Sequence, residues 1–201
     1  DQYWSQILHD TDPHIQQKEG SLWLPSAGVV HPLSLAKTIL EHPNITWYPN
    51  HDIEKIKIEN NRPIFFANGT KWKSDHVIIC TSHHLSSLQL CDTITVRKSS
   101  GQISYTKNQI STKSFAYSDH AYLTPYWNGT QCFGATYHLH ELRTDVCDED
   151  HQDNIERLRS NHPSIQIPKE SLLGRCGIRA QTNNFLPIVG PVPDKKWYTT
   201  Q

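Results

Sequence analysis

Two Asn-Gly steps constrain the fold of this chain more than any other feature, because each lies between segments of alternating polar and apolar residues. The steps are Asn68-Gly69, within "RPIFFANGTKWKS", and Asn128-Gly129, within "YLTPYWNGTQCFGATY". Both residues of such a step readily adopt the positive φ angles of a two-residue type I′ turn, whose twist matches that of paired strands. The sequence therefore predicts two antiparallel hairpins, one in each half of the chain.

The segments around these turns predict an α+β fold. In the first half, Pro32 begins a helical pattern that ends at His42-Pro43, and the continuous apolar run 76–80 is typical of a strand buried on both faces. In the second half, alternating segments predict an antiparallel sheet, and "CDEDHQDNIERLRSNHP" predicts one helix. Further short elements are expected at 3–9 (a helical turn) and at 22–24, 44–48 and 52–59 (strands), and the sheet segments are 93–98, 102–106, 114–118, 120–126 and 131–138.

Composition excludes some classes of protein and leaves two cellular settings open. The 201 residues carry a net charge of −1, so composition gives no argument for a nucleic-acid surface, and no apolar run is long enough for a membrane span. Five widely spaced cysteines form no C-x-x-C pair, which favours reduced thiols in a cytoplasmic protein. Three N-x-T sequons, at Asn44, Asn68 and Asn128, keep open a secreted, non-catalytic β-rich binding module.

Most of the common catalytic and cofactor-binding motifs are absent from the sequence. None of the nine glycines falls in a G-x-S-x-G, G-x-G-x-x-G or P-loop pattern. His138 and His140 would place two imidazoles on the same side of a strand, and Glu141 or His151 would have to supply a third metal ligand. We interpret them as surface histidines and expect no metal site.

Arg179 is the remaining candidate for chemistry. It lies in "GIRAQTNNFLPIVGPVPD", where a polar segment runs into an apolar Pro-Ile-Val-Gly turn. A guanidinium group matches a carboxylate with two parallel hydrogen bonds, so an arginine beside a cleft is a natural carboxylate anchor. A structural or surface arginine is the alternative, because most arginines contact no ligand.

The pattern around Arg179 resembles an element of the D-amino-acid oxidase-like flavoenzymes, a family that includes glycine and sarcosine oxidases. "GIRAQTNNFLPIVG" matches the family's G-x-R-x-x-T-x-D-x-x-P-x-x-G pattern at Gly177, Arg179, Thr182, Pro187 and Gly190. Three further stretches resemble the family in the same order along the chain, and together the four span residues 20–194. They are "GSLWLPSAGVVHPLSLAKTIL", "WKSDHVIICTSHH" and "YLTPYWNGTQCFGATY".

Three departures from the family's pattern bear on activity. Asn184 stands where the family usually has Asp, and Ser82 stands where it tends to have Gly. The stretch "KSSGQISY" lacks the arginine usually found before Gly101-Gln102. A side chain in place of glycine obstructs close approach of the backbone to a flavin. One interpretation is therefore that the chain is a weakened or divergent member of the family.

The resemblance implies an internal, truncated part of a flavoenzyme. It places residues 1–23 at the edge of the substrate domain, 24–85 in the α/β FAD-binding domain, 86–176 in an antiparallel substrate domain with one helix, and 177–201 in the return to the FAD-binding domain. The family's glycine-rich FAD fingerprint would lie outside this chain, so the chain alone is expected neither to retain FAD nor to be active. By resemblance, Arg179 anchors a substrate carboxylate, Thr81, Ser82, Pro187 and Gly190 contact FAD, and Gly134, Thr136 and Tyr137 lie on the substrate side.

Within the family, the chain looks most like the tRNA-modifying members. That likeness implies FAD-dependent oxidative removal of the carboxymethyl group from 5-carboxymethylaminomethyl-(2-thio)uridine at the tRNA wobble position, with a flanking methyltransferase domain in the parent chain. The near-neutral net charge indicates that this stretch is not the main tRNA-binding surface. A sister amine oxidase of the glycine or sarcosine type, acting on a free amino acid, shares every quoted motif and is the alternative.

Overall fold

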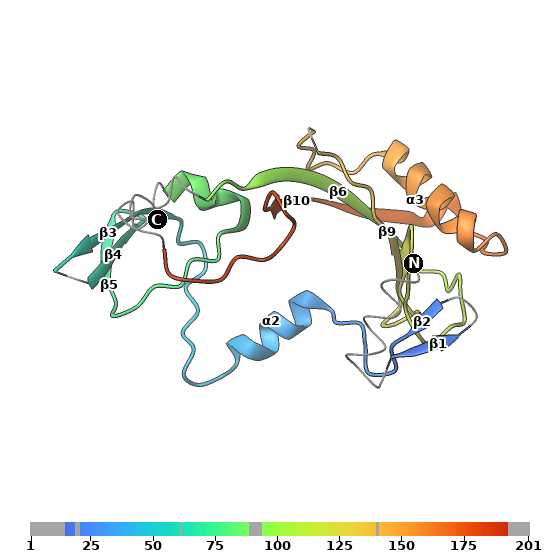
Figure 1. The fold of residues 1–201 in the computed structure, drawn as a ribbon, viewed down its shortest axis with the longest axis horizontal. Helices are drawn as coiled ribbons and strands as arrows, with labels where there is room; N and C mark the ends of the chain where they lie inside the picture. The colour runs from blue at the N-terminus through green and yellow to red at the C-terminus, as the bar shows by residue number, and fades with distance from the viewer. Residues whose placement is uncertain (1–14, 19–20, 61, 89–93, 140, 193–201) are drawn as a thin grey trace. The chain divides into compact units, whose positions relative to one another are not determined.

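The structure, a computed structural model, describes residues 15–18, 21–60, 62–88, 94–139 and 141–192. The chain divides into two compact units, and the boundary in the sequence lies between residues 42 and 43 (Figure 1). Within the described residues, no helix is both long and apolar enough to cross a membrane.

The first unit contains a short antiparallel pair and one helix. Strand β1 (Gln16–Lys18) pairs with β2 (Ser21–Trp23), and helix α2 (Pro32–Leu40) follows, which confirms the helix predicted from the proline-initiated pattern. The side chain of His31 caps this helix by accepting a hydrogen bond of 3.2 Å from the backbone N–H of Ser34. No residue of α2 is buried, so its apolar side chains have no covering layer among the described residues.

The second unit begins with a three-stranded antiparallel sheet of order β3-β4-β5. Its strands are β3 (Ile53–Glu59), β4 (Arg62–Ala67) and β5 (Thr70–Lys73). The turn between β4 and β5 has φ angles of 48° at Asn68 and 71° at Gly69, the left-handed pair that a type I′ turn requires. The first predicted hairpin is therefore confirmed.

The second sheet has five antiparallel strands in the order β10-β6-β9-β8-β7. In chain order the strands are β6 (Arg97–Thr106), β7 (Tyr117–Ser118), β8 (Tyr122–Leu123), β9 (Gln131–Gly134) and β10 (Leu172–Gln181). Strand β6 joins the end of the expected strand 93–98 to the expected strand 102–106, because every residue of β6 pairs with a residue of β10. Residues 94–96 are in no strand, and residue 93 lies outside the described residues. The second Asn-Gly turn is also confirmed, with φ angles of 50° at Asn128 and 77° at Gly129.

Helix α3 (Asp148–Asn161) packs against this five-stranded sheet and closes the main core. Its first turn is acidic and its last turn carries Arg159, which is the charge pattern predicted for the segment. Burial of one large apolar side chain contributes roughly 1.5–3 kcal/mol, so this cluster holds helix and sheet together. Its buried members are Ala121, Leu123, Phe133, Ile155, Leu158 and Ile167.

Two expected strands are wrong, and one expected element cannot be assessed. Residues 44–48 and 76–80 belong to no strand, and Ile78 in the second segment is 88% exposed. An apolar run becomes a buried strand only where neighbouring strands and both covering layers are present, and the described residues supply cover on one side only. The expected strand 22–24 corresponds to β2, one residue earlier, and the expected helical turn at 3–9 lies outside the described residues.

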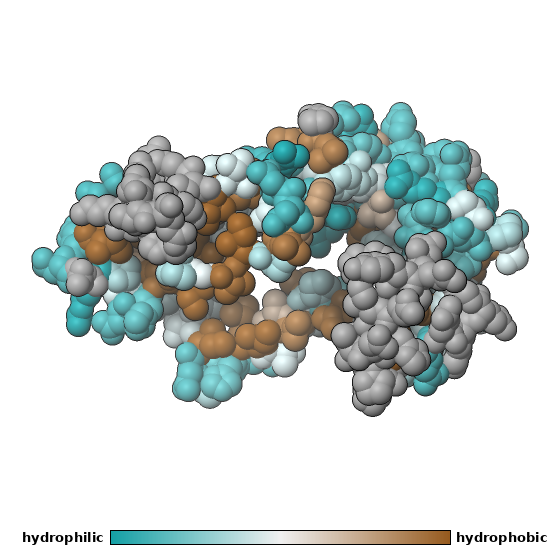
Figure 2. All heavy atoms as spheres, viewed as in Figure 1, coloured by the Kyte–Doolittle hydropathy of each residue, from teal (hydrophilic) through white to brown (hydrophobic). Residues whose placement is uncertain are grey.

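Apolar surface remains open in two parts of the second unit (Figure 2). Residues 76–81, with Leu88 at the end of the 3-10 helix η1 (Ser82–Leu88), line a hollow of about 340 Å³ against the apolar side of sheet β3-β4-β5. Residues 185–189 form the other part, where Val189 is 96% exposed and Phe185 is 71% exposed.

Candidate functional site

The pairing of β6 with β10 decides which face of the five-stranded sheet each side chain occupies. Residues directly opposite one another share a face, and the register sets Arg179 opposite Ser99 and Gly177 opposite Gly101. Helix α3 covers the other face of the sheet. We use "open face" for the side defined by Ser99, Gly101, Tyr122, Cys132, Gly177 and Arg179, and "closed face" for the side defined by Ser100, Gln102, Ser104, Phe133 and Gly174.

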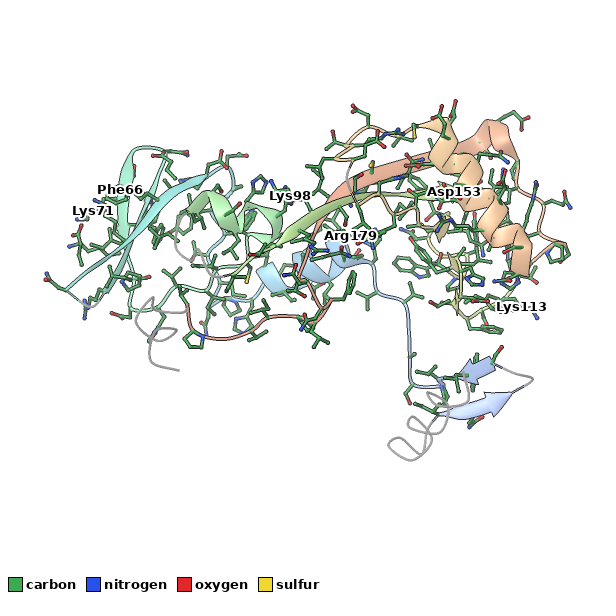
Figure 3. The ribbon with its side chains drawn as sticks, turned by 45° about the horizontal axis from the view of Figure 1, so that its top comes forward. Phe66, Lys71, Lys98, Lys113, Asp153 and Arg179 are labelled. Atoms are coloured by element: carbon green, nitrogen blue, oxygen red, sulfur yellow. The ribbon has the colours of Figure 1, made fainter. Side chains whose placement is uncertain are left out.

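Arg179 (labelled in Figure 3) lies on the open face with Gly101 and Gly177, two residues without side chains that we call the glycine floor. Its Nη2 atom lies 3.6 Å from the position that a Cβ on Gly101 would occupy. A Cβ there would also approach the backbone oxygen of Thr136 to 2.4 Å, so only glycine fits at position 101. Gly177, directly opposite, has nothing within 4 Å of its Cβ position. Gly101 therefore admits the backbone of Thr136, and the open space for a small ligand lies over Gly177.

Tyr122 is a second polar side chain on the open face. Burial raises the pKa of its phenol, and the nearby Cys132 thiol raises it further, whereas the positive charge of Arg179 lowers it. The phenol therefore stays protonated at neutral pH and can donate a hydrogen bond. The register of the sheet places Tyr122 on the same face as Arg179.

Tyr137 joins this face through its hydroxyl group, which donates a hydrogen bond to Oε1 of Gln181. Gln181 follows Arg179 by two residues on β10 and so lies on the same face. Thr136, in contrast, is fully buried, and its Oγ1 accepts a hydrogen bond of 2.9 Å from the backbone N–H of Gln102. A Cβ on Gly134 would meet the side chain of Asn154 on α3 at 3.2 Å. Of the three predicted substrate-side residues, the structure brings only Tyr137 to the side of Arg179.

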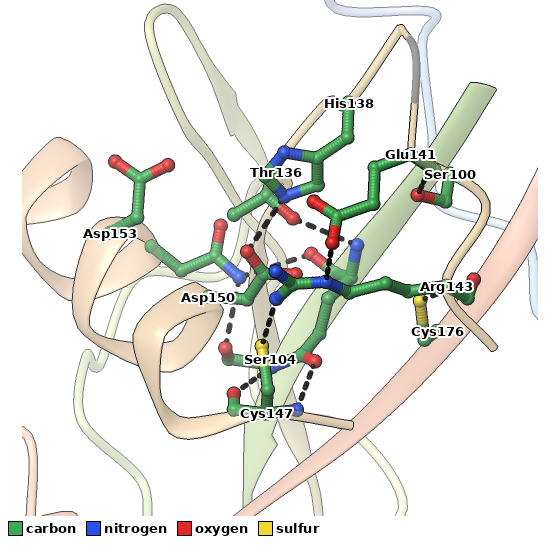
Figure 4. Close-up of polar contacts among 12 residues, drawn as sticks. Ser100, Ser104, Thr136, His138, Glu141, Arg143, Cys147, Asp150, Asp153 and Cys176 are labelled. Carbon is green, nitrogen blue, oxygen red and sulfur yellow. Dashed lines mark hydrogen bonds and ion pairs between the residues drawn. The ribbon is translucent and has the colours of Figure 1, made fainter. Parts of the chain in front are cut away.

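The closed face carries a network of buried polar side chains (Figure 4). The Gln102 side chain donates to the backbone oxygen of Cys147 at 2.9 Å and accepts from its backbone N–H at 2.8 Å, which ties β6 to the start of α3. Asn154 Nδ2 donates to the backbone oxygen of Gln102 and to Ser104 Oγ, each at 3.0 Å. These groups bond one another, so the network fixes the helix on the sheet and leaves few donors or acceptors for a ligand.

The pair of Ser104 and His151 has the composition of a nucleophile and its base but lies in the wrong place for catalysis. Ser104 Oγ lies 2.8 Å from His151 Nδ1. Ser104 is fully buried, however, and a Cβ on Gly174 would lie only 2.9 Å from the His151 ring. A substrate cannot reach the hydroxyl, so the pair is structural.

The described histidines that were considered as metal ligands each interact with a different side chain. His138 Nε2 lies 2.8 Å from Asp150 Oδ1, and His151 is engaged by Ser104. His140 lies outside the described residues. No group of three or more His, Cys, Asp or Glu side chains that could hold a metal ion occurs in the described part of the chain.

The segment expected to approach the flavin keeps a backbone shape that favours glycine. Ser82 has a φ of 52°, in the left-handed region where non-glycine residues are uncommon. The serine thus adopts the conformation that the family's glycine would adopt with less strain. Beside it, Thr81 Oγ1 is buried and has no hydrogen-bond partner among the described residues. Buried hydroxyl groups without a partner are rare, so Thr81 fits a position that contacts a ligand.

Asn184 preserves the turn that the family builds with Asp. Its Oδ1 accepts hydrogen bonds from Thr182 Oγ1 at 3.1 Å and from the backbone N–H of Leu186 at 3.2 Å. Both bonds need an oxygen acceptor and not a charge, so the amide replaces the carboxylate. Pro187 and Gly190 follow on the exposed segment and remain open to solvent.

Position 100 has no room for an arginine in this chain. Ser100 is fully buried, and its hydroxyl donates a hydrogen bond to the backbone oxygen of Glu141. On the other face, Ser99 Oγ lies opposite Arg179, is buried and has no partner in the part of the chain that the structure describes.

The comparison with protein families settles the family. The model of the family described as FAD dependent oxidoreductase (DAO) matches residues 2–200. The chain belongs to this family. The resemblance stated from the four sequence stretches is confirmed, and so is the α+β fold with part of an FAD-binding domain.

Curated relatives add a more specific similarity. The tRNA 5-methylaminomethyl-2-thiouridine biosynthesis bifunctional protein MnmC of Saccharophagus degradans is 30% identical over 190 residues, which cover 89% of this chain and 26% of that protein. The protein of the same name from Marinobacter nauticus is 27% identical over 187 residues, covering 89% of this chain and 30% of that protein. The chain therefore spans less than a third of the length of these relatives.

Solved structures of amine-oxidising family members share the fold. A glycine oxidase from Bacillus cereus superposes with a TM-score of 0.71 at 18% identity, covering 93% of this chain and 54% of that chain. A glycine oxidase from Geobacillus kaustophilus gives a TM-score of 0.61 at 14% identity, covering 76% of this chain and 42% of that chain.

FAD is the cofactor of this family, and the residues of this chain fit part of it. Thr81, with its unpartnered hydroxyl, and Ser82, with its glycine-like backbone, suit contact with the cofactor. A glycine-rich turn for the pyrophosphate does not occur in the sequence. The described residues can therefore line the cofactor but cannot hold its phosphates in the usual way.

The sequence singled out Arg179 and Tyr137, but it did not reveal the floor beneath them or the neighbouring Tyr122. Gly101 and Gly177 each interrupt a strand pattern, and glycine inside a strand often marks close approach of a ligand or another backbone. That signal was available in the sequence. Their position opposite each other was not, because it depends on pairing between residues far apart in the chain.

Proposed function

We propose that the chain is part of a cytoplasmic FAD-dependent oxidoreductase that removes the carboxymethyl group from 5-carboxymethylaminomethyl-(2-thio)uridine at the tRNA wobble position. The family membership and the names of the curated relatives support this proposal. The observation that carries it is the open face, where the guanidinium group of Arg179 lies close to Gly101 and shares the face with the half-buried phenol of Tyr122. A methyltransferase domain in the same protein is part of the proposal.

The substrate is a secondary amine that carries a carboxymethyl group, so recognition requires a cation for the carboxylate and space for a short chain. The exposed guanidinium group of Arg179 supplies the cation, with donors in the fork that matches a carboxylate. Gly177, with nothing within 4 Å of its Cβ position, supplies the space. The protonated phenol of Tyr122 can donate a hydrogen bond to the bound substrate, and the bond between Tyr137 and Gln181 fixes the edge of the site.

FAD, when bound, accepts the hydride from the carbon between the amine nitrogen and the carboxylate, and the protein orients the two partners. Thr81 and Ser82 would contact the cofactor from the start of η1 and the residue before it, and Pro187 and Gly190 would contact it from the segment after β10. In this proposal, residues 24–85 and 177–201 belong to the FAD-binding domain and 86–176 to the substrate domain.

The deciding experiment compares substrates with the flavin-loaded protein. We expect tRNA bearing 5-carboxymethylaminomethyluridine to be converted to the aminomethyl form, with release of glyoxylate, as seen by mass spectrometry of the digested nucleosides. Free glycine and sarcosine serve as competing substrates at matched concentrations. Turnover of free glycine with no change in the tRNA would contradict the proposal.

An amine oxidase that acts on a free amino acid is the second candidate. The arginine and the glycine floor recognise a carboxylate and a short chain, and free glycine offers both. The substrate comparison separates the candidates, because a free amino acid oxidase turns over glycine in the absence of tRNA.

The isolated chain is expected to lack bound flavin and activity. The pyrophosphate of FAD normally lies on a glycine-rich turn at a helix N-terminus, and this sequence contains no such turn. The flavin absorbance of the purified chain, relative to protein, measures this directly. Flavin retained at a stoichiometric level would show that other residues hold the cofactor.

A further inference from the structure

One face of sheet β3-β4-β5 concentrates positive charge that the composition of the whole chain conceals. The register sets Lys55, Phe66 and Lys71 in one row across the three strands and Lys57, Ile64 and Lys73 in the next. Glu59 and Arg62 form a third row. We use "basic face" for this side of the sheet, defined by Lys55, Lys57, Arg62, Lys71 and Lys73.

The four lysines of the basic face are exposed and flank the central strand on both sides. Lysines two residues apart on one strand are separated by about 6.6–6.8 Å, and the two outer strands lie about 10 Å apart. The face therefore offers two parallel rows of ammonium groups. In a chain with a net charge of −1, this is a marked local excess of positive charge.

The carboxylate of Glu59 is surrounded by these lysines. Lys71 Nζ lies 2.9 Å from Glu59 Oε2, and this hydrogen bond is the largest cause of a lowered pKa for Glu59. The charges of Lys57 and Lys73 lower the pKa further. Arg62 is paired with Asp75 at 3.5 Å, but both side chains are largely exposed and weakly held. One carboxylate does not neutralise four lysines, so the face remains electropositive.

Phe66 lies at the centre of the basic face beside Lys71 (Figure 3). The Nζ atom of Lys57 lies 5.9 Å from the centre of its ring, within the range of a cation–π contact. Ile64, the other apolar residue of the face, is only 3% exposed. The face thus offers charge and little apolar surface. This combination disfavours insertion into a lipid layer and favours binding to a rigid array of anions.

We propose that the basic face binds the phosphate backbone of RNA, as one of the contacts by which the protein positions a tRNA substrate. The proposal rests on the proposed function for the identity of the nucleic acid. Exposed lysines that neutralise phosphates release condensed counterions, so they give affinity without reading sequence. The opposite face of the same sheet turns Ile56 and Phe65 toward the hollow, which leaves the lysines free to face the ligand.

The test measures binding of the full chain to a fluorescently labelled, unmodified tRNA transcript by anisotropy over a series of salt concentrations. The variant Lys55→Gln/Lys73→Gln removes one lysine from each outer strand without touching the ion pair of Lys71. The matched control is Lys107→Gln/Lys113→Gln, which removes the same charge from another part of the chain. Thermal melting of all three proteins checks that folding is equal.

We expect the basic-face variant to bind tRNA on the order of tenfold more weakly near 0.1 M salt and to lower the salt slope by about 1.5–2. The control should change affinity by less than about twofold. Equal weakening in both variants, or no binding by the unaltered chain, would overturn the proposal. Binding to vesicles rich in anionic phosphatidylserine, with none to tRNA, would also overturn it and assign the face to a membrane.

The same substitutions, made in the flavin-loaded parent protein, distinguish this proposal from the proposed function. If the flavin-loaded protein oxidises the tRNA substrate but the basic-face variant does so with unchanged KM, the basic face is wrong and the function stands. If the unaltered protein binds tRNA through the lysines but oxidises only free glycine, the proposed function is wrong and the binding surface stands.

Discussion

The two faces of the five-stranded sheet differ in what their polar groups bind. On the closed face, Gln102, Ser104 and Asn154 are fully buried and bond one another or the backbone of α3. On the open face, Arg179 is exposed and lies over backbone that carries no side chains. Buried polar groups that satisfy each other stabilise a fold, whereas an exposed cation over a cleared floor is suited to a ligand. A search for reactive residue types that lie close together would have selected Ser104 and His151 as the candidate site. These two residues lie on the closed face, away from Arg179.

The largest expected effect comes from a substitution of Phe133 on the closed face. This side chain is fully buried in the cluster between sheet and helix. Phe133→Ala should lower the free energy of unfolding by about 3–5 kcal/mol, through lost burial and the cavity left behind. Urea denaturation of the isolated chain measures the change. Phe133→Leu, which keeps most of the volume, should lose clearly less, and an equal loss in both variants would show that the ring does not carry the packing.

A substitution of Arg179 on the open face should impair catalysis and leave the folding of the chain nearly unchanged. In the flavin-loaded protein, Arg179→Ala should lower kcat/KM by about 2–5 kcal/mol, or roughly thirty- to several-thousand-fold, because the substrate carboxylate loses its partner. Arg179→Lys should recover only part, since an ammonium group cannot present the bidentate fork.

The matched control for Arg179 is Arg175→Ala on the same strand and the same face, and it should have little effect. Activity per bound flavin is the measurement in every case. If the alanine variant at position 179 loses flavin or stability but keeps its turnover per flavin, then the arginine is structural.

The glycine floor offers a sharper comparison, because its two members are opposite each other but differ in free space. Gly101→Ala should lower the free energy of unfolding by about 1–3 kcal/mol, because its Cβ would collide with the backbone oxygen of Thr136 at 2.4 Å. Gly177→Ala has nothing within 4 Å and should be within about 0.5 kcal/mol of the unaltered chain. Thermal or urea unfolding decides, and comparable losses at both positions would contradict the geometry.

The smallest effect expected is a pH dependence that comes from the closed face. Burial lowers the pKa of His151, and the charges of Asp148 and Asp150 oppose this only in part. The unfolded chain therefore takes up a proton at this position more readily than the folded chain, so stability should fall as the pH drops below the usual histidine value of 6.5. Urea midpoints at pH 7.5 and 5.5 measure the slope. His151→Gln should reduce it, and an unchanged slope would show that other histidines are responsible.

Local patterns in the sequence predicted the local elements well. The two hairpin turns, helix α2 and helix α3 were all expected, because each depends on residues within a few positions of one another. Residues 76–80 were expected to form a buried strand and do not, since burial depends on layers that an apolar run cannot specify by itself.

The candidate site was predictable only in part. Arg179 and Tyr137 came from the sequence, through the resemblance to the flavoenzyme family. The opposition of Gly101 to Gly177, the nearness of Tyr122 and the burial of Thr136 each require the register between strands that are distant in sequence. Three-dimensional pairing of this kind leaves no local signal, so the division into open and closed faces could not be foreseen.

The unbroken ladder of β10 has a consequence for how this gene can change in length. All ten residues from Leu172 to Gln181 pair with β6 without a bulge, and successive side chains alternate between the two faces. An insertion or deletion of one residue between Gly174 and Arg179 would move the guanidinium group to the side of α3. Substitutions that spare Gly174 and Arg179 keep this alternation, whereas a change of length, even by one codon, should abolish carboxylate recognition.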